Sequence, residues 1–386
     1  MGQDVVTPRG QILFKKDTVL STEDIGHLRF YNFDQVVVDG SVADSAADGE
    51  LLASEIEALE EENTKAPTPL KVAGDKKMHK GLGDDVSGEV AQSEAMERKQ
   101  ALLRSSDFHS FQMNYAFGVN DIKELFQRII DGESVTQDDM QKVVDRVCEG
   151  VTSSHKLFDM LHEVKADEDA VYTHCINVSL LSKYIGRWLH FSESDQTCLG
   201  ICGLMHDIGK LLVPPEVLNK KGKLTDDEFQ LIRRHPIFGF NQLKNLDIDP
   251  RIKKAALMHH ERENGSGYPY HRVPGEVHPF AQVVAIADVY DAMTQSRSYR
   301  TSICPFTIIE NFENDGISTY NSQFLMIFLE NIAQTYQGDR VILNDGTPAD
   351  IAFLNRSRFS RPVLKLSDGT FLDLIQRPDL KIQSVI

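Results

Sequence analysis

Seven imidazole and carboxylate side chains in this 386-residue chain could act together as ligands for metal ions. They are His174, His206, Asp207, His235, His259, His260 and Asp288. Such mixed nitrogen and oxygen donors suit iron, manganese or zinc better than calcium or magnesium. The residue types therefore indicate a metal site, provided that the fold brings the side chains together.

Helical periodicity predicts that these side chains face the interior. Four segments place six of them on or beside a stripe of apolar residues: AVYTHCINVSLL, LGICGLMHDIGKLL, RIKKAALMHHE and AQVVAIADVYDAM. The seventh, His235, precedes Pro236 at the end of EFQLIRRHP. On these stripes Lys210 accompanies His206, with Asp207 at the edge, and Asp291 accompanies Asp288. One histidine on an apolar helix face is more often a hydrogen-bonded core residue than a ligand. Burying the whole set would be costly unless metal ions compensate, so we interpret it as a metal site.

The rest of the chain divides by composition into four parts. Residues 1–40 have the alternating side-chain pattern and turn residues of short strands around one small helix, which predicts a small α/β segment. Residues 41–100 contain no aromatic residue and carry 14 acidic against 7 basic side chains, as expected of an acidic flexible linker. Residues 101–336 have helical spacing, and residues 337–386 place Asp-Gly turns between β-rich runs. The expected fold class is mainly α, an all-helical core with small β-containing appendages at both ends.

Composition excludes several classes of protein. Hydrophobic residues at 41% and charged residues at 26% are typical of a globular protein, and the net charge of −17 argues against binding to duplex nucleic acid. No apolar run reaches the roughly 18 residues of a membrane span, and the first residues lack the features of a signal peptide. The five cysteines form no CxxC pair. We expect a cytoplasmic protein with reduced thiols and no membrane partner.

The ordered pattern H…HD…H…HH…D resembles that of the HD-GYP proteins, a branch of the HD phosphohydrolase superfamily. The matching stretches are YTHCINVS, GLMHDIGKLLVP, LNKKGKLTDDEF, RRHPIFG, HHERENGSGYP and AIADVYDAMTQSRSYR, which cover roughly residues 165–300. The resemblance implies an all-helical catalytic core of the HD type with a centre of two or three metals. It also implies hydrolysis of the bacterial messenger cyclic di-GMP to linear pGpG, with GMP as a possible further product.

The resemblance assigns roles to the seven ligands. One metal position matches His174, His206, Asp207 and Asp288, and a second matches His235, His259 and His260, with Asp207 as the bridging carboxylate. A hydroxide held between two such metals would attack the phosphodiester, which makes Asp207 part of the catalytic machinery. Lys210 matches the family lysine, whose charge could stabilise a phosphate oxygen or the departing alkoxide.

Substrate contacts also follow from the resemblance. The GYP step comprises Gly267, Tyr268 and Pro269. Tyr268 offers a ring face for a base and a hydroxyl for phosphate, while the glycines allow a tight backbone path. Arg297 and Arg300 match positions that meet the phosphates and guanine, which suits the bidentate contacts and stacking of arginine.

Two positions depart from the family pattern. Some members carry a glutamate for a third metal one turn before the first ligand histidine, and Ala170 stands there in this chain. We therefore expect two divalent transition metals, iron or manganese before zinc. Asn264 replaces the usual aspartate of the GYP loop and lacks its charge, which bears on rate or substrate preference rather than on metal binding.

The leading hypothesis is a cyclic di-GMP phosphodiesterase. One alternative keeps the chemistry but changes the substrate to another cyclic dinucleotide. The other is a weakly active or inactive sensor or scaffold that binds the nucleotide or a partner protein with a diguanylate cyclase domain. A homodimer is also compatible with the sequence.

Overall fold

The structure is a computed structural model that describes residues 5–6, 12–14, 100–151, 154–164, 170–272, 274–294 and 303–386. Within the predicted segment 1–40 it describes two short antiparallel strands, β1 (Val5–Val6) and β2 (Ile12–Phe14). The helix expected there, and the predicted linker up to residue 99, lie outside the described residues.

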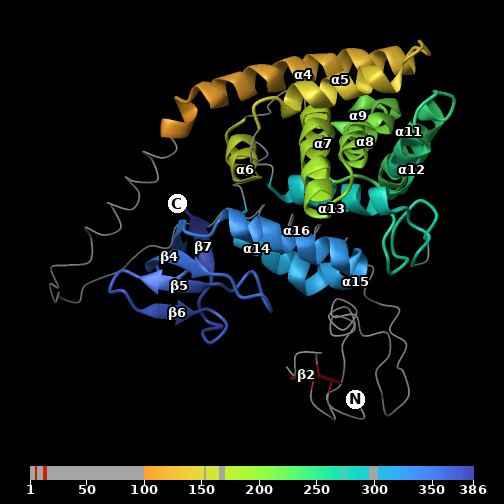
Figure 1. Ribbon diagram of the computed structural model, residues 1–386. Helices are drawn as coiled ribbons and strands as arrows, with labels where there is room; N and C mark the ends of the chain where they lie inside the picture. The colour runs from red at the N-terminus through yellow and green to blue at the C-terminus, as the bar shows by residue number, and fades with distance from the viewer. Residues whose placement is uncertain are drawn as a thin grey trace, which may run out of the picture.

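The described residues between 100 and 336 form helices joined by loops around one apolar core (Figure 1). The longer helices are α4 (Ser106–Ile130), α5 (Gln137–Cys148), α6 (Ser154–Glu163), α7 (Ala170–Trp188), α8 (Glu193–Met205), α11 (His235–Leu243), α12 (Pro250–Met258), α13 (Pro279–Thr294) and α16 (Ser322–Thr335). The shorter ones are η1 (Ile208–Leu212), α9 (Pro215–Leu218), α10 (Asp226–Ile232), α14 (Pro305–Asn311), η2 (Phe312–Gly316) and α15 (Ile317–Thr319). Among these described helices, none is both long and apolar enough to cross a membrane.

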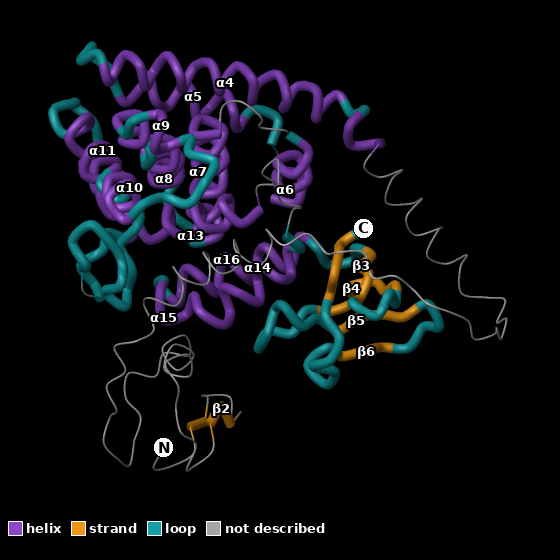
Figure 2. Tube along the Cα trace, turned by 180° about the vertical axis from the view of Figure 1, so that it is seen from behind, coloured by secondary structure: helices purple, strands orange, loops and turns teal. Residues whose placement is uncertain are grey.

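Helices α4 and α5 lie side by side across one end of α7, and α14 to α16 form a layer on the opposite side of α13 (Figures 1 and 2). The Ser105 hydroxyl caps α4, and Thr136 with Asp139 forms a capping box at the start of α5. The inner stripe of α4 includes the fully buried Phe111 and Phe126. Local capping and amphipathic spacing thus explain why this pair of helices covers the core.

Helices α7 and α13 lie in the interior and are buried along most of their length. Helix α7 packs against α8 and α13. A helix buried on all sides tolerates polar side chains only where they find partners. These two helices carry His174 and Asp288, so the most deeply packed elements of the fold position two of the predicted ligands.

Five antiparallel strands follow the helices, in the order β6–β5–β4–β3–β7 (Figure 2). They are β3 (Arg340–Leu343), β4 (Pro348–Phe353), β5 (Val363–Leu366), β6 (Phe371–Asp373) and β7 (Ile382–Val385). The predicted Asp-Gly turns join β3 to β4 and β5 to β6, with a φ of 85° at both Gly346 and Gly369. The expected fold class, mainly α with small β-containing parts, is confirmed. The domain boundaries given above stay predictions.

The prediction of one continuous helical stripe through His206 and Lys210 is wrong. Helix α8 ends at Met205, and the chain continues through Asp207 (φ −105°) into the 3₁₀ turn η1. The reason is the approach of η1 to α11. A Cβ atom on Gly209 would lie only 2.0 Å from the carbonyl oxygen of His235. The bend lets this turn pack backbone to backbone against α11.

A glycine also sets the contact between α7 and α8, and this gives a stability prediction. A Cβ atom on Gly203 would lie 2.6 Å from the carbonyl oxygen of Val178 and 2.8 Å from the backbone of Ser179. We expect Gly203→Ala to lower the free energy of unfolding by about 1–3 kcal/mol, because two backbones would have to separate. Chemical denaturation measures this value. Gly222→Ala is the matched control, since nothing lies within 4 Å of the added carbon, and an equal effect of both variants would contradict the prediction.

Candidate metal centre

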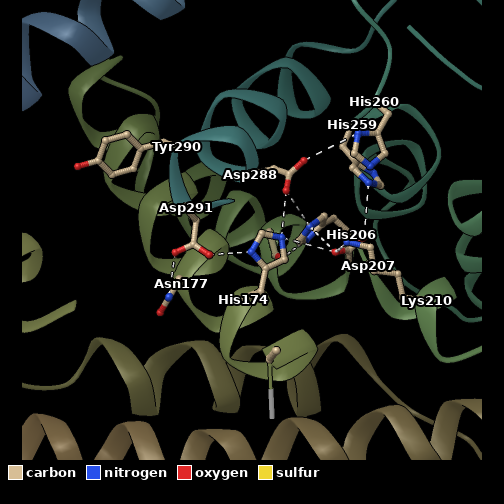
Figure 3. Close-up of polar contacts among 12 residues, drawn as sticks. His174, Asn177, His206, Asp207, Lys210, His259, His260, Asp288, Tyr290 and Asp291 are labelled. Atoms are coloured by element: carbon tan, nitrogen blue, oxygen red, sulfur yellow. Dashed lines mark hydrogen bonds and ion pairs between the residues drawn. The ribbon is translucent and has the colours of Figure 1, made fainter. Parts of the chain in front are cut away.

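The structure brings the predicted ligands together in two clusters that share Asp207. In each cluster the ligand atoms lie within 4.8 Å of one another. One cluster contains His174, His206 and Asp207, and the other contains Asp207, His235, His259 and His260. Asp288 joins the first cluster, since its Oδ1 lies 3.0 Å from His174 Nε2 (Figure 3). All seven residues predicted as ligands therefore lie at one place.

The two oxygens of Asp207 face different clusters. Oδ2 lies 3.2 Å from His206 Nε2 and 3.5 Å from His174 Nε2. Oδ1 lies 3.1 Å from His235 Nε2 and 3.7 Å from His259 Nε2. This is the arrangement that a carboxylate bridging two metal ions requires.

Three histidines are held so that their Nε2 atoms face the clusters. The Nδ1–H groups donate to backbone carbonyl oxygens near the end of the preceding helix: Gly203 for His206 at 2.7 Å, Ile232 for His235 at 2.8 Å, and Ala255 and Ala256 for His259 at 3.1 Å. A donating Nδ1 leaves Nε2 of a neutral ring as a lone pair. Such backbone bonds are typical of metal-binding histidines.

The donor atoms fit a metal because several of them make no hydrogen bond of good geometry. In the described part of the chain, neither oxygen of Asp207 nor Nε2 of His206 has hydrogen-bond geometry with any group, although Asp207 is 1% exposed. The Nε2 atoms of His235 and His259 lie 3.2 Å apart. When the Nδ1 atoms of both neutral rings donate, both Nε2 atoms carry lone pairs. These two lone pairs would repel each other at this distance. A cation bound at about 2.1 Å from each nitrogen would account for this spacing.

Burial and charge set the protonation of the second cluster. Burial, together with the neighbouring rings of His206 and His235, holds the pKa of His259 well below its usual value. Burial, together with the neighbouring rings of His259 and His235, does the same to the pKa of His260. Both rings are therefore neutral near pH 7, the form that binds metal.

The first cluster is held by ionised carboxylates. Burial opposes ionisation of Asp207, but the positive charges of His206 and Lys210 hold its pKa well below the usual range. Burial opposes protonation of His174, yet its hydrogen bonds to Asp288 and Asp291 raise its pKa to about 10. A metal that binds here would have to displace a proton from His174, which makes the affinity rise with pH.

A buried chain of hydrogen bonds holds His174 from behind. Its Nδ1 donates to Asp291 at 2.7 Å, and Asp291 accepts from the Asn177 amide at 2.9 Å (Figure 3). Tyr115 of α4 then donates to Asn177 at 2.7 Å. The sequence placed Asp291 on the stripe of Asp288 but assigned it no role. Asn177 and Tyr115 were missed, because the contact between α4 and α7 leaves no local signal.

Lys210 lies beside the shared carboxylate. Its Nζ is 2.6 Å from Asp207 Oδ2, and its side chain is 24% exposed. Burial opposes its charge, but the charges of Asp207 and Asp288 raise its pKa above the usual value. The 3₁₀ turn η1 therefore brings a stable cation to the edge of the metal centre, as the predicted role of Lys210 requires.

The GYP loop packs directly against the second cluster. The ring of Tyr268 stacks on the ring of His260, with centroids 4.5 Å apart, and its backbone N–H donates to the His260 carbonyl at 3.0 Å. Gly267 is buried, and a Cβ atom there would lie 2.4 Å from the same carbonyl oxygen. The bond between Tyr268 and Pro269 is a cis peptide.

The carboxylate of Glu261, which the sequence did not single out, holds the GYP loop. It accepts hydrogen bonds from the backbone N–H groups of Tyr270 and Arg272.

Asn264 and Ala170, where the sequence departs from the family pattern, are not part of either cluster. Asn264 is exposed, and its side-chain oxygen accepts from the backbone and hydroxyl of Ser266, so it forms a local turn. Ala170 is the exposed first residue of α7 and offers no ligand atom. Arg297 and Arg300 lie outside the described residues, so their predicted contacts stay predictions.

Residues 126–312 match the family model of the HD domain, the same region in which the motifs resemble the HD-GYP proteins. The chain is 33% identical over 180 residues to the cyclic di-GMP phosphodiesterase PA4108 of Pseudomonas aeruginosa, covering 46% of this chain and 44% of that protein. It is 32% identical over 179 residues to the 3'3'-cGAMP-specific phosphodiesterase 1 of Vibrio cholerae, covering 46% and 42%.

Among solved structures, the chain is similar to Bd1817, an HDG"Y"P protein of Bdellovibrio bacteriovorus, with 16% identity and a TM-score of 0.45. That match covers 63% of this chain and 79% of the other. The matches to the two curated relatives span less than half of their length. What those proteins act on is therefore considered for this chain only as a proposal.

Removal of the shared carboxylate should empty the centre. We expect the unaltered protein to bind two equivalents of manganese or ferrous ion, and Asp207→Ala to bind fewer than one, because both clusters lose a ligand. Elemental analysis after dialysis measures the content. His109→Ala is the control, since that ring is exposed on α4 and bonds to the nearby Ser105 carbonyl, away from the clusters. Unchanged metal content in both Asp207→Ala and His206→Ala would show that the clusters are not the metal site.

The chain behind His174 should affect the strength of metal binding. We expect Asp291→Asn to weaken binding of manganese about 10- to 100-fold, because the amide no longer accepts strongly from the His174 ring. Titration calorimetry measures the affinity. Asp138→Asn is the matched control, because that exposed carboxylate pairs only with Lys142 on the surface of α5. An affinity within twofold of the unaltered protein would contradict a supporting role for Asp291.

Proposed function

We propose that this protein is a metal-dependent phosphodiesterase that hydrolyses cyclic di-GMP to pGpG. The observation that carries the proposal is the pair of ligand clusters joined by the buried Asp207 carboxylate. Two divalent metals bound there would supply a bridging hydroxide as nucleophile and neutralise charge on the phosphodiester. Iron or manganese is our preferred metal, since five imidazoles and two carboxylates form the donor set.

The protein's own residues orient the reaction. Asp207 ties the two clusters together, and the histidines keep fixed directions through their Nδ1 bonds to backbone carbonyls. Lys210 carries its charge to the edge of the centre, where an ammonium would stabilise a phosphate oxygen or the departing alkoxide. The loop with Tyr268 borders the same centre through its stack on His260, which favours a role in holding the nucleotide.

The names of two relatives suggest different cyclic dinucleotides as the substrate. One relative is named for cyclic di-GMP and another, at nearly the same identity, for 3'3'-cGAMP. Cyclic di-GMP is our first choice because it is the substrate that the HD-GYP resemblance implies and the one for which PA4108 is named. A second cyclic dinucleotide as substrate is the alternative, and comparison of kcat/KM for the two compounds decides between them. A cyclase-domain partner and a homodimer stay predictions.

The proposal is tested on the purified full chain loaded with manganese, ferrous ion or zinc. We expect time-dependent conversion of cyclic di-GMP to pGpG with at least one metal, followed by liquid chromatography, and no conversion after chelation. The Asp207→Ala variant should be inactive. Tight binding of the nucleotide without linear product under any of the three metals would contradict the proposal and favour a sensor.

Lys210 gives a separate prediction about rate. We expect Lys210→Met to lower kcat about 10²- to 10³-fold while the metal content stays the same, because a charge next to the reacting phosphate is lost. Steady-state kinetics with elemental analysis measures both quantities. Lys142→Met is the control, since Lys142 is exposed on α5 and pairs with Asp138. A kcat of Lys210→Met within threefold of the unaltered protein would remove Lys210 from the mechanism.

A further inference from the structure

Arg233 forms the outer layer of a stack that ends on a predicted metal ligand. Its guanidinium lies 4.5 Å from the centroid of the Tyr268 ring. That ring is parallel to within 21° with the ring of His260 and 4.5 Å from it. Arg233 also stands two residues before His235, the neighbouring ligand of the same cluster. Arg233 is the first residue of the matching stretch RRHPIFG, but the resemblance was not used to assign it a role.

The guanidinium of Arg233 has no anionic partner among the described residues. Its recorded contacts are the rings of Tyr268 and Phe229, and its side chain is half-buried. Arg262, on the other side of the loop, differs. Its Nη1 donates to the carbonyl oxygens of His259 and Glu261, and its guanidinium lies over the ring of Tyr320, so backbone contacts hold it in place.

An unpaired cation beside a centre for two divalent metals is electrostatically unfavourable unless an anion joins it. A cyclic dinucleotide carries two phosphodiester groups. Only one can be attacked at the metals, and the other keeps its negative charge. Arginine binds phosphate through paired N–H donors while its flat face still rests on an aromatic ring.

From this geometry we infer that Arg233 binds the phosphate of the cyclic dinucleotide that is not cleaved, with Tyr268 holding the guanidinium in place. The inference rests on the proposed function and adds a substrate contact to it. Arg233 thereby selects substrates with two phosphates over simple diesters with one. The residue lies on the bend between α10 and α11, so the element that supplies His235 also supplies this contact.

The test compares two substrates, cyclic di-GMP and bis(p-nitrophenyl) phosphate, which has a single phosphate. We expect Arg233→Ala to raise KM for cyclic di-GMP about 10- to 100-fold with kcat within threefold, because a charge-assisted contact is lost. Its KM for bis(p-nitrophenyl) phosphate and its metal content should stay within twofold. Arg233→Lys should recover part of the affinity.

Arg234→Ala is the matched control, because this adjacent arginine is exposed and lies over Phe238. It should leave both KM values unchanged. If Arg233→Ala raises KM equally for both substrates, or leaves KM for cyclic di-GMP unchanged, the inference is overturned. If the unaltered, metal-loaded protein cleaves the simple diester but neither binds nor cleaves cyclic di-GMP, the proposed function fails and the inference fails with it.

Discussion

The buried carboxylate of Asp207 is the constraint on which the rest of the centre depends. An anion taken out of water is costly unless cations surround it. Here one oxygen faces His174 and His206, the other faces His235 and His259, and Lys210 lies against the same group. Every element near the centre therefore has to direct a nitrogen or a positive charge at one point.

The fold meets this requirement in part through helix ends. His206 and His259 stand at the C-terminal caps of α8 and α12, and each anchors its ring on carbonyl oxygens of the last turn. Gly203 and Gly209 allow the backbones of neighbouring elements to approach closely. Close backbone packing and fixed ring directions thus arise from the same contacts.

Charge is distributed unevenly between the chain and its centre. The chain as a whole carries a net charge of −17, which would repel an anionic substrate. Near the two clusters, however, Lys210 and Arg233 supply positive charge, and bound metals would add more. The local field, rather than the net charge, decides whether a dinucleotide can approach.

The sequence by itself determined the types of the ligands, their order and the mainly helical fold, because periodicity, turn chemistry and residue type are local properties. It also predicted the Asp-Gly turns of the C-terminal sheet. It did not predict the end of α8 before His206, since close packing of η1 against α11 causes that bend. The support of His174 by Asp291, Asn177 and Tyr115, and the stack of Arg233 on Tyr268, join residues far apart in the chain. Only tertiary structure decides such contacts, because they depend on how whole helices pack.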